Sequence, residues 1–239
     1  MDKIIVGWMY PNLLNLHGER GSMQALPEIG KKMGIEVEIL RIEDFDDPIP
    51  FENLDLMVFL PGEITQLSRL IPTLQTKELR NYLETGGHLL AIGTSGLMFG
   101  HSIRREDGST LKCLGYLDMT AKERKFVWGD DLYFRIDGSD MELAGSQIQM
   151  ADVDTDMALG TTLYGMGNHN SGKEGARWNN LIYTNCLGPL FVKNPWFAEM
   201  IFKEILQKKG EEAPNVAEFP MAKASFNSTT SFIKTKMNP

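Results

Sequence analysis

Short apolar runs alternate with amphipathic stretches over the first hundred residues of this 239-residue chain. The apolar runs have the length of β-strands and lie at 3–9, 55–60 and 88–92, and the stretch 36–42 alternates between polar and apolar residues as a strand does. An amphipathic stretch that contains Pro27 ends near Lys32, so we expect a helix that starts late or kinks at the proline. Leucines at helical spacing predict one further helix over 68–84. This alternation predicts an α/β fold, a flavodoxin-like doubly wound sheet that is mostly parallel.

The stretch 86–100 forms the centre of the predicted sheet. The apolar run 88–92 is followed at once by Gly93-Thr94-Ser95-Gly96, small residues that let the chain turn sharply into a helix. A strand, a tight turn and a helix form the elbow on which many α/β enzymes mount a nucleophile. Backbone N–H groups around such a turn can hold an oxyanion. The sequence therefore predicts a catalytic elbow, although the turn contains no cysteine.

After Gly100 the sequence pattern changes from alternating strands and helices to short strand candidates. Asp107-Gly108 is typical of a hairpin turn. Short strand candidates, separated by Gly and Asp, follow at 132–136, 147–150 and 159–164. They predict an antiparallel extension of the sheet. A last strand at 181–183 and a closing helix at 195–208 complete the predicted domain.

From Gly210 onward the chain has no helical or strand periodicity. We therefore divide it into a domain at 1–209 and a C-terminal tail or docking segment at 210–239. Exposed aromatic side chains favour association. We expect Phe219, Phe226 and Phe232 to anchor this segment on the domain's own surface or on a partner.

Composition narrows the classes of function. The formal charge of −8 argues against nucleic acid or an anionic membrane as the main partner. No apolar run has membrane-spanning length and no signal-peptide pattern precedes the first strand, so we expect a cytoplasmic protein. Cys113 and Cys186 form no disulfide framework or metal-ligand pattern. We expect no metal and no cofactor.

Several motifs resemble class I glutamine amidotransferases of the branch that contains cobyric acid synthase. They are Asn15-Leu16-His17-Gly18-Glu19-Arg20-Gly21, Asp107-Gly108-Ser109-Thr110-Leu111, Gly165-Met166-Gly167-Asn168 and Gly188-Pro189-Leu190-Phe191-Val192-Lys193-Asn194. Within that branch the chain is most similar to the amidotransferase subunit of lipid II isoglutaminyl synthase, which pairs with a Mur-ligase-like subunit. The resemblance implies a glutaminase whose elbow cysteine attacks glutamine with a histidine as base.

The residues that this chemistry requires are missing at the matching positions. The family's cysteine position falls on Gly93, its glutamine position on Leu97, and its histidine position on Leu187. The loop that helps to form the oxyanion hole is reduced to Pro61-Gly62-Glu63, and an Asn-His-Gly element has no counterpart. The sequence therefore predicts a pseudoenzyme with no catalytic residues, whose former glutamine pocket is made by Gly62, Gly93, Thr94, Ser95 and Leu97.

Three functions follow from these residues. The first is a glutaminase-inactive amidotransferase-like subunit that forms a heterodimer with a Mur-ligase-like, ATP-dependent enzyme of peptidoglycan (lipid II) metabolism. The second is a hydrolase of altered chemistry that uses Ser95 or Thr94, with His169 as the base. In the alternative without catalysis, Ser95 caps the helix that follows it. The third is a stand-alone sensor that binds a small molecule in the former glutamine pocket.

Overall fold

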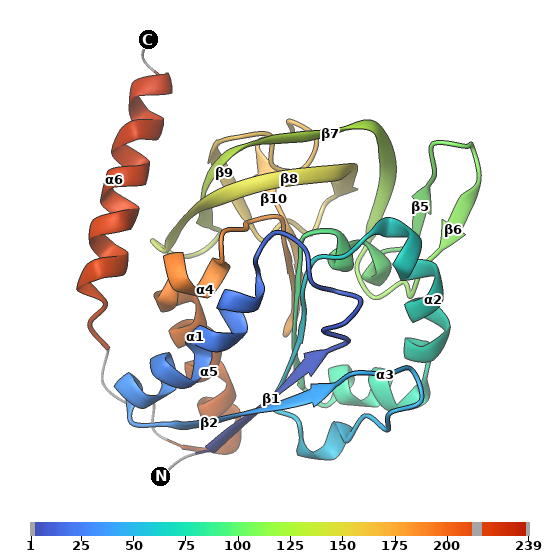
Figure 1. Ribbon diagram of the computed structural model, residues 1–239, viewed down its shortest axis with the longest axis horizontal. Helices are drawn as coiled ribbons and strands as arrows, with labels where there is room; N and C mark the ends of the chain where they lie inside the picture. The colour runs from blue at the N-terminus through green and yellow to red at the C-terminus, as the bar shows by residue number, and fades with distance from the viewer. Residues whose placement is uncertain (1–2, 212–216, 238–239) are drawn as a thin grey trace.

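The computed structural model describes residues 3–211 and 217–237 and contains two six-stranded sheets (Figure 1). The strands of the first sheet are β1 (Lys3–Met9), β2 (Glu36–Ile42), β3 (Leu56–Phe59), β4 (His88–Ile92), β11 (Ala176–Trp178) and β12 (Leu181–Thr184). Their order is β11-β12-β4-β3-β1-β2, parallel throughout except for β11. The predicted doubly wound, mostly parallel sheet is confirmed, and the antiparallel strands predicted as its extension at 132–136, 147–150 and 159–164 lie in the second sheet.

Helices cover both faces of the first sheet (Figure 1). They are α1 (Arg20–Met33), α4 (Leu190–Lys193) and α5 (Pro195–Lys209) on one face, and α2 (Ile64–Leu74) and α3 (Lys77–Glu84) on the other, with a short 3-10 turn at Phe51–Asn53. The apolar runs of β3 and β4 are buried along their whole length between these layers. This explains why those strands are continuous hydrophobic stretches rather than alternating ones.

Two helix predictions are corrected. The single helix predicted at 68–84 is two helices, because Thr76 starts a new one: its hydroxyl accepts a hydrogen bond from the N–H of Leu79 at 3.1 Å. The helix that contains Pro27 begins at Arg20, so the late start is wrong.

The second sheet lies over the carboxyl ends of the first sheet's parallel strands (Figure 1). Its strands are β5 (Ser102–Arg104), β6 (Thr110–Lys112), β7 (Met119–Ile136), β8 (Glu142–Thr155), β9 (Gly160–Tyr164) and β10 (Lys173–Glu174). The candidates at 132–136 and 147–150 are thus only parts of two long strands. Their remaining residues were missed because the outer face of β7 and β8 is polar: Lys122 is exposed while its neighbour Ala121 is buried.

The C-terminal segment is helical, which corrects the prediction that it lacks periodicity. Helix α6 (Pro220–Met237) buries Phe226, Thr230 and Ile233, spaced four and three residues apart. The ring of Phe226 packs edge-on against Trp196, with centroids 5.2 Å apart. Phe219 also packs on the domain, whereas Phe232 is 57% exposed and is no anchor on the domain's own surface. The periodicity was missed because only three residues form the buried stripe and one of them is a threonine.

None of the helices within residues 3–211 and 217–237 combines the length and the apolar character that a membrane span requires.

Candidate functional site

The elbow after β4 has the backbone geometry of a nucleophile turn without the nucleophile. Gly93 has a φ of +63°, in the left-handed region, and the 3-10 helix Gly93–Phe99 starts there. A Cβ atom at this position would lie 3.1 Å from Pro61 Cγ and 3.5 Å from Leu187 Cδ2. The positions matched to the family's cysteine and histidine therefore adjoin one another, and neither carries a reactive group.

The Thr94 side chain forms hydrogen bonds with the backbone of Gly62 in the neighbouring loop. Its hydroxyl accepts a hydrogen bond from the N–H of Gly62 at 3.0 Å and donates to the carbonyl of the same residue. A backbone N–H can stabilise an oxyanion only if no other acceptor holds it. The Gly62 donor, which the resemblance assigns to the oxyanion hole, is thus already engaged.

The residues of the predicted glutamine pocket are all packed in the interior. Gly62, Gly93 and Thr94 are buried, Leu97 is 2% exposed, and Leu187 fills the space beside Gly93. The hydroxyl of Ser95 is fully buried and lies 3.0 Å from the carbonyl oxygens of Phe59 and Ile92. The expected helix cap is wrong, because this hydroxyl donates to carbonyls instead of accepting from N–H groups.

We expect Ser95→Ala to lower the free energy of unfolding by about 1 kcal/mol, the typical net contribution of one hydrogen bond. Urea denaturation measures this change, with Ser68→Ala on the exposed side of α2 as the control. Any cellular role should be unchanged. A stably folded Ser95→Ala protein that has lost its cellular role would instead support a hydrolase that uses this serine.

His169, the base of the hydrolase alternative, pairs with a carboxylate, and both cysteines are buried. His169 lies on the outer face of the second sheet, where its Nδ1 is 3.0 Å from a carboxylate oxygen of Asp152. Burial raises the pKa of the Cys186 thiol well above its usual range and that of Cys113 to about 11. Both thiols are therefore protonated at neutral pH, and protonated thiols are poor nucleophiles.

Two buried carboxylates that the sequence analysis did not single out have structural contacts. Glu19 accepts hydrogen bonds from the N–H groups of Gly188 at 2.5 Å and Leu190 at 3.1 Å, and so ties the opening motif to the Gly-Pro turn. Glu174 is fully buried and accepts from the Thr184 hydroxyl at 2.9 Å and the Asn185 N–H at 2.6 Å. Burial raises the pKa of both carboxyl groups.

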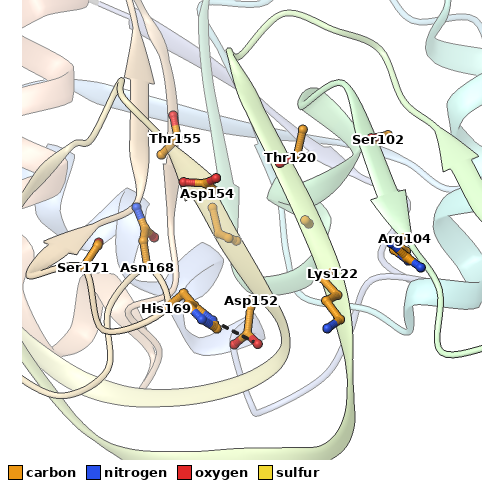
Figure 2. A pocket seen from close by; sticks show the side chains of 12 residues that line it. Ser102, Arg104, Thr120, Lys122, Asp152, Asp154, Thr155, Asn168, His169 and Ser171 are labelled. Atoms are coloured by element: carbon orange, nitrogen blue, oxygen red, sulfur yellow. Dashed lines mark ion pairs between the residues drawn. The ribbon is translucent and has the colours of Figure 1, made fainter.

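The second sheet carries a cleft that the sequence did not predict. Its cavity of about 470 Å³ lies between β5 and β7 on one side and β8 with the loop before β10 on the other (Figure 2). Arg104 and Lys122 line the first side, and Asp152, Asp154 and His169 line the second. Within the described part of the chain, no three His, Cys, Asp or Glu side chains are grouped to hold a metal ion.

Two curated proteins are similar to this chain over most of their lengths. The lipid II isoglutaminyl synthase (glutamine-hydrolyzing) subunit GatD of Streptococcus pneumoniae is 24% identical over 216 residues, which covers 85% of this chain and 81% of that protein. The GatD subunit of Staphylococcus aureus is 24% identical over 229 residues, covering 91% and 93%. No protein-family model matches the chain.

Solved structures support the fold. A crystal structure of a glutamine amidotransferase has a TM-score of 0.57 at 16% identity and covers 84% of this chain and 98% of its own. The PurLQS structure from Thermotoga maritima has a TM-score of 0.56 at 12% identity, covering 87% and 97%. The resemblance found in the motifs is therefore confirmed: this chain has the glutamine amidotransferase fold and is a relative of the GatD subunits.

Proposed function

We propose that this chain is an amidotransferase-like subunit that has lost glutaminase activity and works in a complex with a Mur-ligase-like, ATP-dependent enzyme of cell-wall precursor metabolism. The observation that carries the proposal is the elbow, where Gly93 and Leu187 adjoin at the matched catalytic positions. A thiolate and an imidazole are required for this mode of glutamine hydrolysis, and neither position supplies one.

The similarity to the GatD subunits supports the second half of the proposal. Those proteins are named as subunits of lipid II isoglutaminyl synthase, and the match spans at least four fifths of each of them. A subunit that keeps its fold but lacks its catalytic groups can still dock on its partner and shape the partner's site. We therefore assign this chain a binding role in such a complex, in the cytoplasm.

The two alternatives find less support in the geometry. A hydrolase needs an exposed nucleophile beside a base, but Ser95 is fully buried and Thr94 is engaged with Gly62. A sensor that binds a metabolite in the former glutamine pocket needs open space there, but Leu97 and Leu187 are both packed in the core.

Co-expression with the Mur-ligase-like protein encoded nearest to this gene tests the complex. We expect the two chains to elute together in size-exclusion chromatography, at the mass of a heterodimer. Truncation after Lys209 should leave the α/β domain folded and weaken the complex, because α6 exposes apolar side chains on its outer side, Phe232 and Met221.

Two single substitutions refine this test. Phe232→Ala should weaken partner binding without changing stability, because Phe232 is exposed. Phe226→Ala is the control: it removes the ring that packs on Trp196 and should therefore loosen α6 from the domain. Separate elution of the full-length chains at micromolar concentration would contradict the proposed partnership.

A further inference from the structure

One end of the cleft on the second sheet contains more cationic than anionic side chains. A second cavity of about 740 Å³ adjoins the cavity of Figure 2, and the two share Arg104, Lys122, Asp152 and His169 in their walls. The second cavity is also lined by the cations Arg105, Arg124 and Lys125 and by the carboxylates Glu106 and Glu123. Cationic side chains thus gather in one place on a chain whose formal charge is −8.

A bulge in β7 produces this gathering. Glu123 pairs with Ala151 of β8 and Trp128 pairs with Gln149, so residues 124–127 stand opposite a single residue of the partner strand. In a regular strand, alternate side chains point to opposite faces. Here residues 122–126 all line the same cavity, which only a distorted strand allows.

Arg104 and Lys122 lack counterions within residues 3–211 and 217–237. They are direct partners in the parallel pairing of β5 with β7, so their side chains lie on the same face of the sheet. Asp152 is the cross-strand partner of Lys122 on β8, but it pairs with Arg124 and His169. Glu123 pairs with Arg105 at 2.6 Å, and Glu106, the other carboxylate in the wall of the second cavity, forms no ion pair with a described residue. Two adjacent cations repel each other unless an anion lies between them.

Two further features of the cleft are consistent with a ligand. The Nε of Arg124 is buried and has no hydrogen-bond partner among the described residues. His169 and Asn170, on the rim, have φ values of +50° and +58°, which is unusual for two successive residues that are not glycine. Backbone strain of this kind is concentrated at ligand-binding sites. Asn168 fixes the loop, because its side-chain amide bonds both the N–H and the carbonyl of Gly175.

We infer that this end of the cleft binds a phosphate group, as the free ion or as part of a small phosphorylated molecule, between Arg104 and Lys122. A phosphate carries up to two negative charges and several acceptor oxygens, which matches two cations held side by side. Two carboxylates of the cleft, Asp154 and Glu106, form no ion pair with a described residue. Asp154 lies two positions along β8 from Asp152, about 7 Å farther along the strand, and Glu106 lies beyond the end of β5. The inference does not depend on the function proposed above.

Calorimetric titration of the full-length protein at constant ionic strength tests the site, with inorganic phosphate, glycerol 3-phosphate and acetate as probes. We expect saturable binding of the two phosphates and none of acetate. Tighter binding of glycerol 3-phosphate would identify a phosphorylated molecule as the ligand, and equal binding would identify the phosphate ion alone.

The variant Arg104→Gln/Lys122→Gln should bind phosphate at least about tenfold more weakly, because two charge-assisted contacts are lost. Lys31→Gln/Lys77→Gln removes the same charge from exposed positions on α1 and α3 and should bind as the parent does. Circular dichroism establishes that both variants are folded. Unchanged affinity in the first variant, an equal loss in the second, or phosphate binding no stronger than that of acetate would each overturn the inference.

Discussion

Purified and supplied with glutamine, this protein should release ammonia at least about 10⁴-fold more slowly than an active amidotransferase subunit. Loss of the nucleophile of a catalytic set costs factors of this size or larger. Here Gly93 has no side chain, Leu187 cannot accept a proton, and the N–H of Gly62 is bound to Thr94. A coupled assay for ammonia measures the rate, with the GatD subunit of Streptococcus pneumoniae, named as glutamine-hydrolyzing, as the positive control.

Substitutions at the elbow sharpen this test. Gly93→Cys alone should stay inactive, because no base adjoins the new thiol and Pro61 lies only 3.1 Å from its Cβ. Leu187→His alone should stay inactive for want of a nucleophile, and it serves as the matched control. The proposal would be wrong if the unaltered chain released ammonia from glutamine and a single substitution abolished that release.

Replacing Glu174 with alanine should lower the free energy of unfolding by about 3 kcal/mol or more. The substitution leaves the buried donors of Thr184 and Asn185 without an acceptor and opens a cavity, and each unpaired buried group costs about 1–3 kcal/mol. Glu174→Gln keeps an acceptor oxygen and most of the volume, so we expect it to cost about 1 kcal/mol. Chemical denaturation of the three proteins measures the difference.

The pH dependence of stability distinguishes the effect of the Glu174 charge from the effect of its packing. Burial raises the pKa of this carboxyl in the folded protein. Between the ordinary glutamate pKa and the raised one, the folded protein binds more protons than the unfolded chain, so stability decreases as pH rises. Relative to Glu174→Gln, the unaltered protein should therefore lose stability over the interval that begins at the ordinary glutamate pKa, about 4.3, and ends at the raised pKa of Glu174. A stability difference that does not change over this interval would contradict a buried carboxyl with a raised pKa.

Much of the first sheet could be predicted because its strands follow simple rules. The runs at 3–9 and 88–92 coincide with β1 and β4, since buried parallel strands are continuous apolar stretches. The stretch 36–42 coincides with the edge strand β2, whose polar and apolar residues alternate. The long strands β7 and β8 were harder to find because one of their faces is polar. Helix α6 was missed because its buried stripe consists of only three residues.

The elbow could be located from the sequence, whereas the cleft could not. The elbow is local, so Gly93 and its neighbours could be located from the sequence, and the resemblance added Leu187, about ninety residues downstream. The hydrogen bond between the Thr94 hydroxyl and Gly62 could not be predicted, because it depends on the side-chain rotamer of Thr94 in the folded protein. The cleft requires the register of β5 against β7 and a bulge between Glu123 and Trp128, neither of which composition or spacing reveals.

The order of strands in the first sheet also has a consequence for folding during synthesis. Strand β4 pairs with β12 through Leu89 and Leu181, and the whole second sheet lies between them in the chain. Until β12 has left the ribosome, one edge of β4 presents unpaired backbone N–H and C=O groups among buried leucines. Such an edge is a template for pairing with another chain. This domain therefore passes through a period of vulnerability to aggregation that ends only when its last quarter is synthesised.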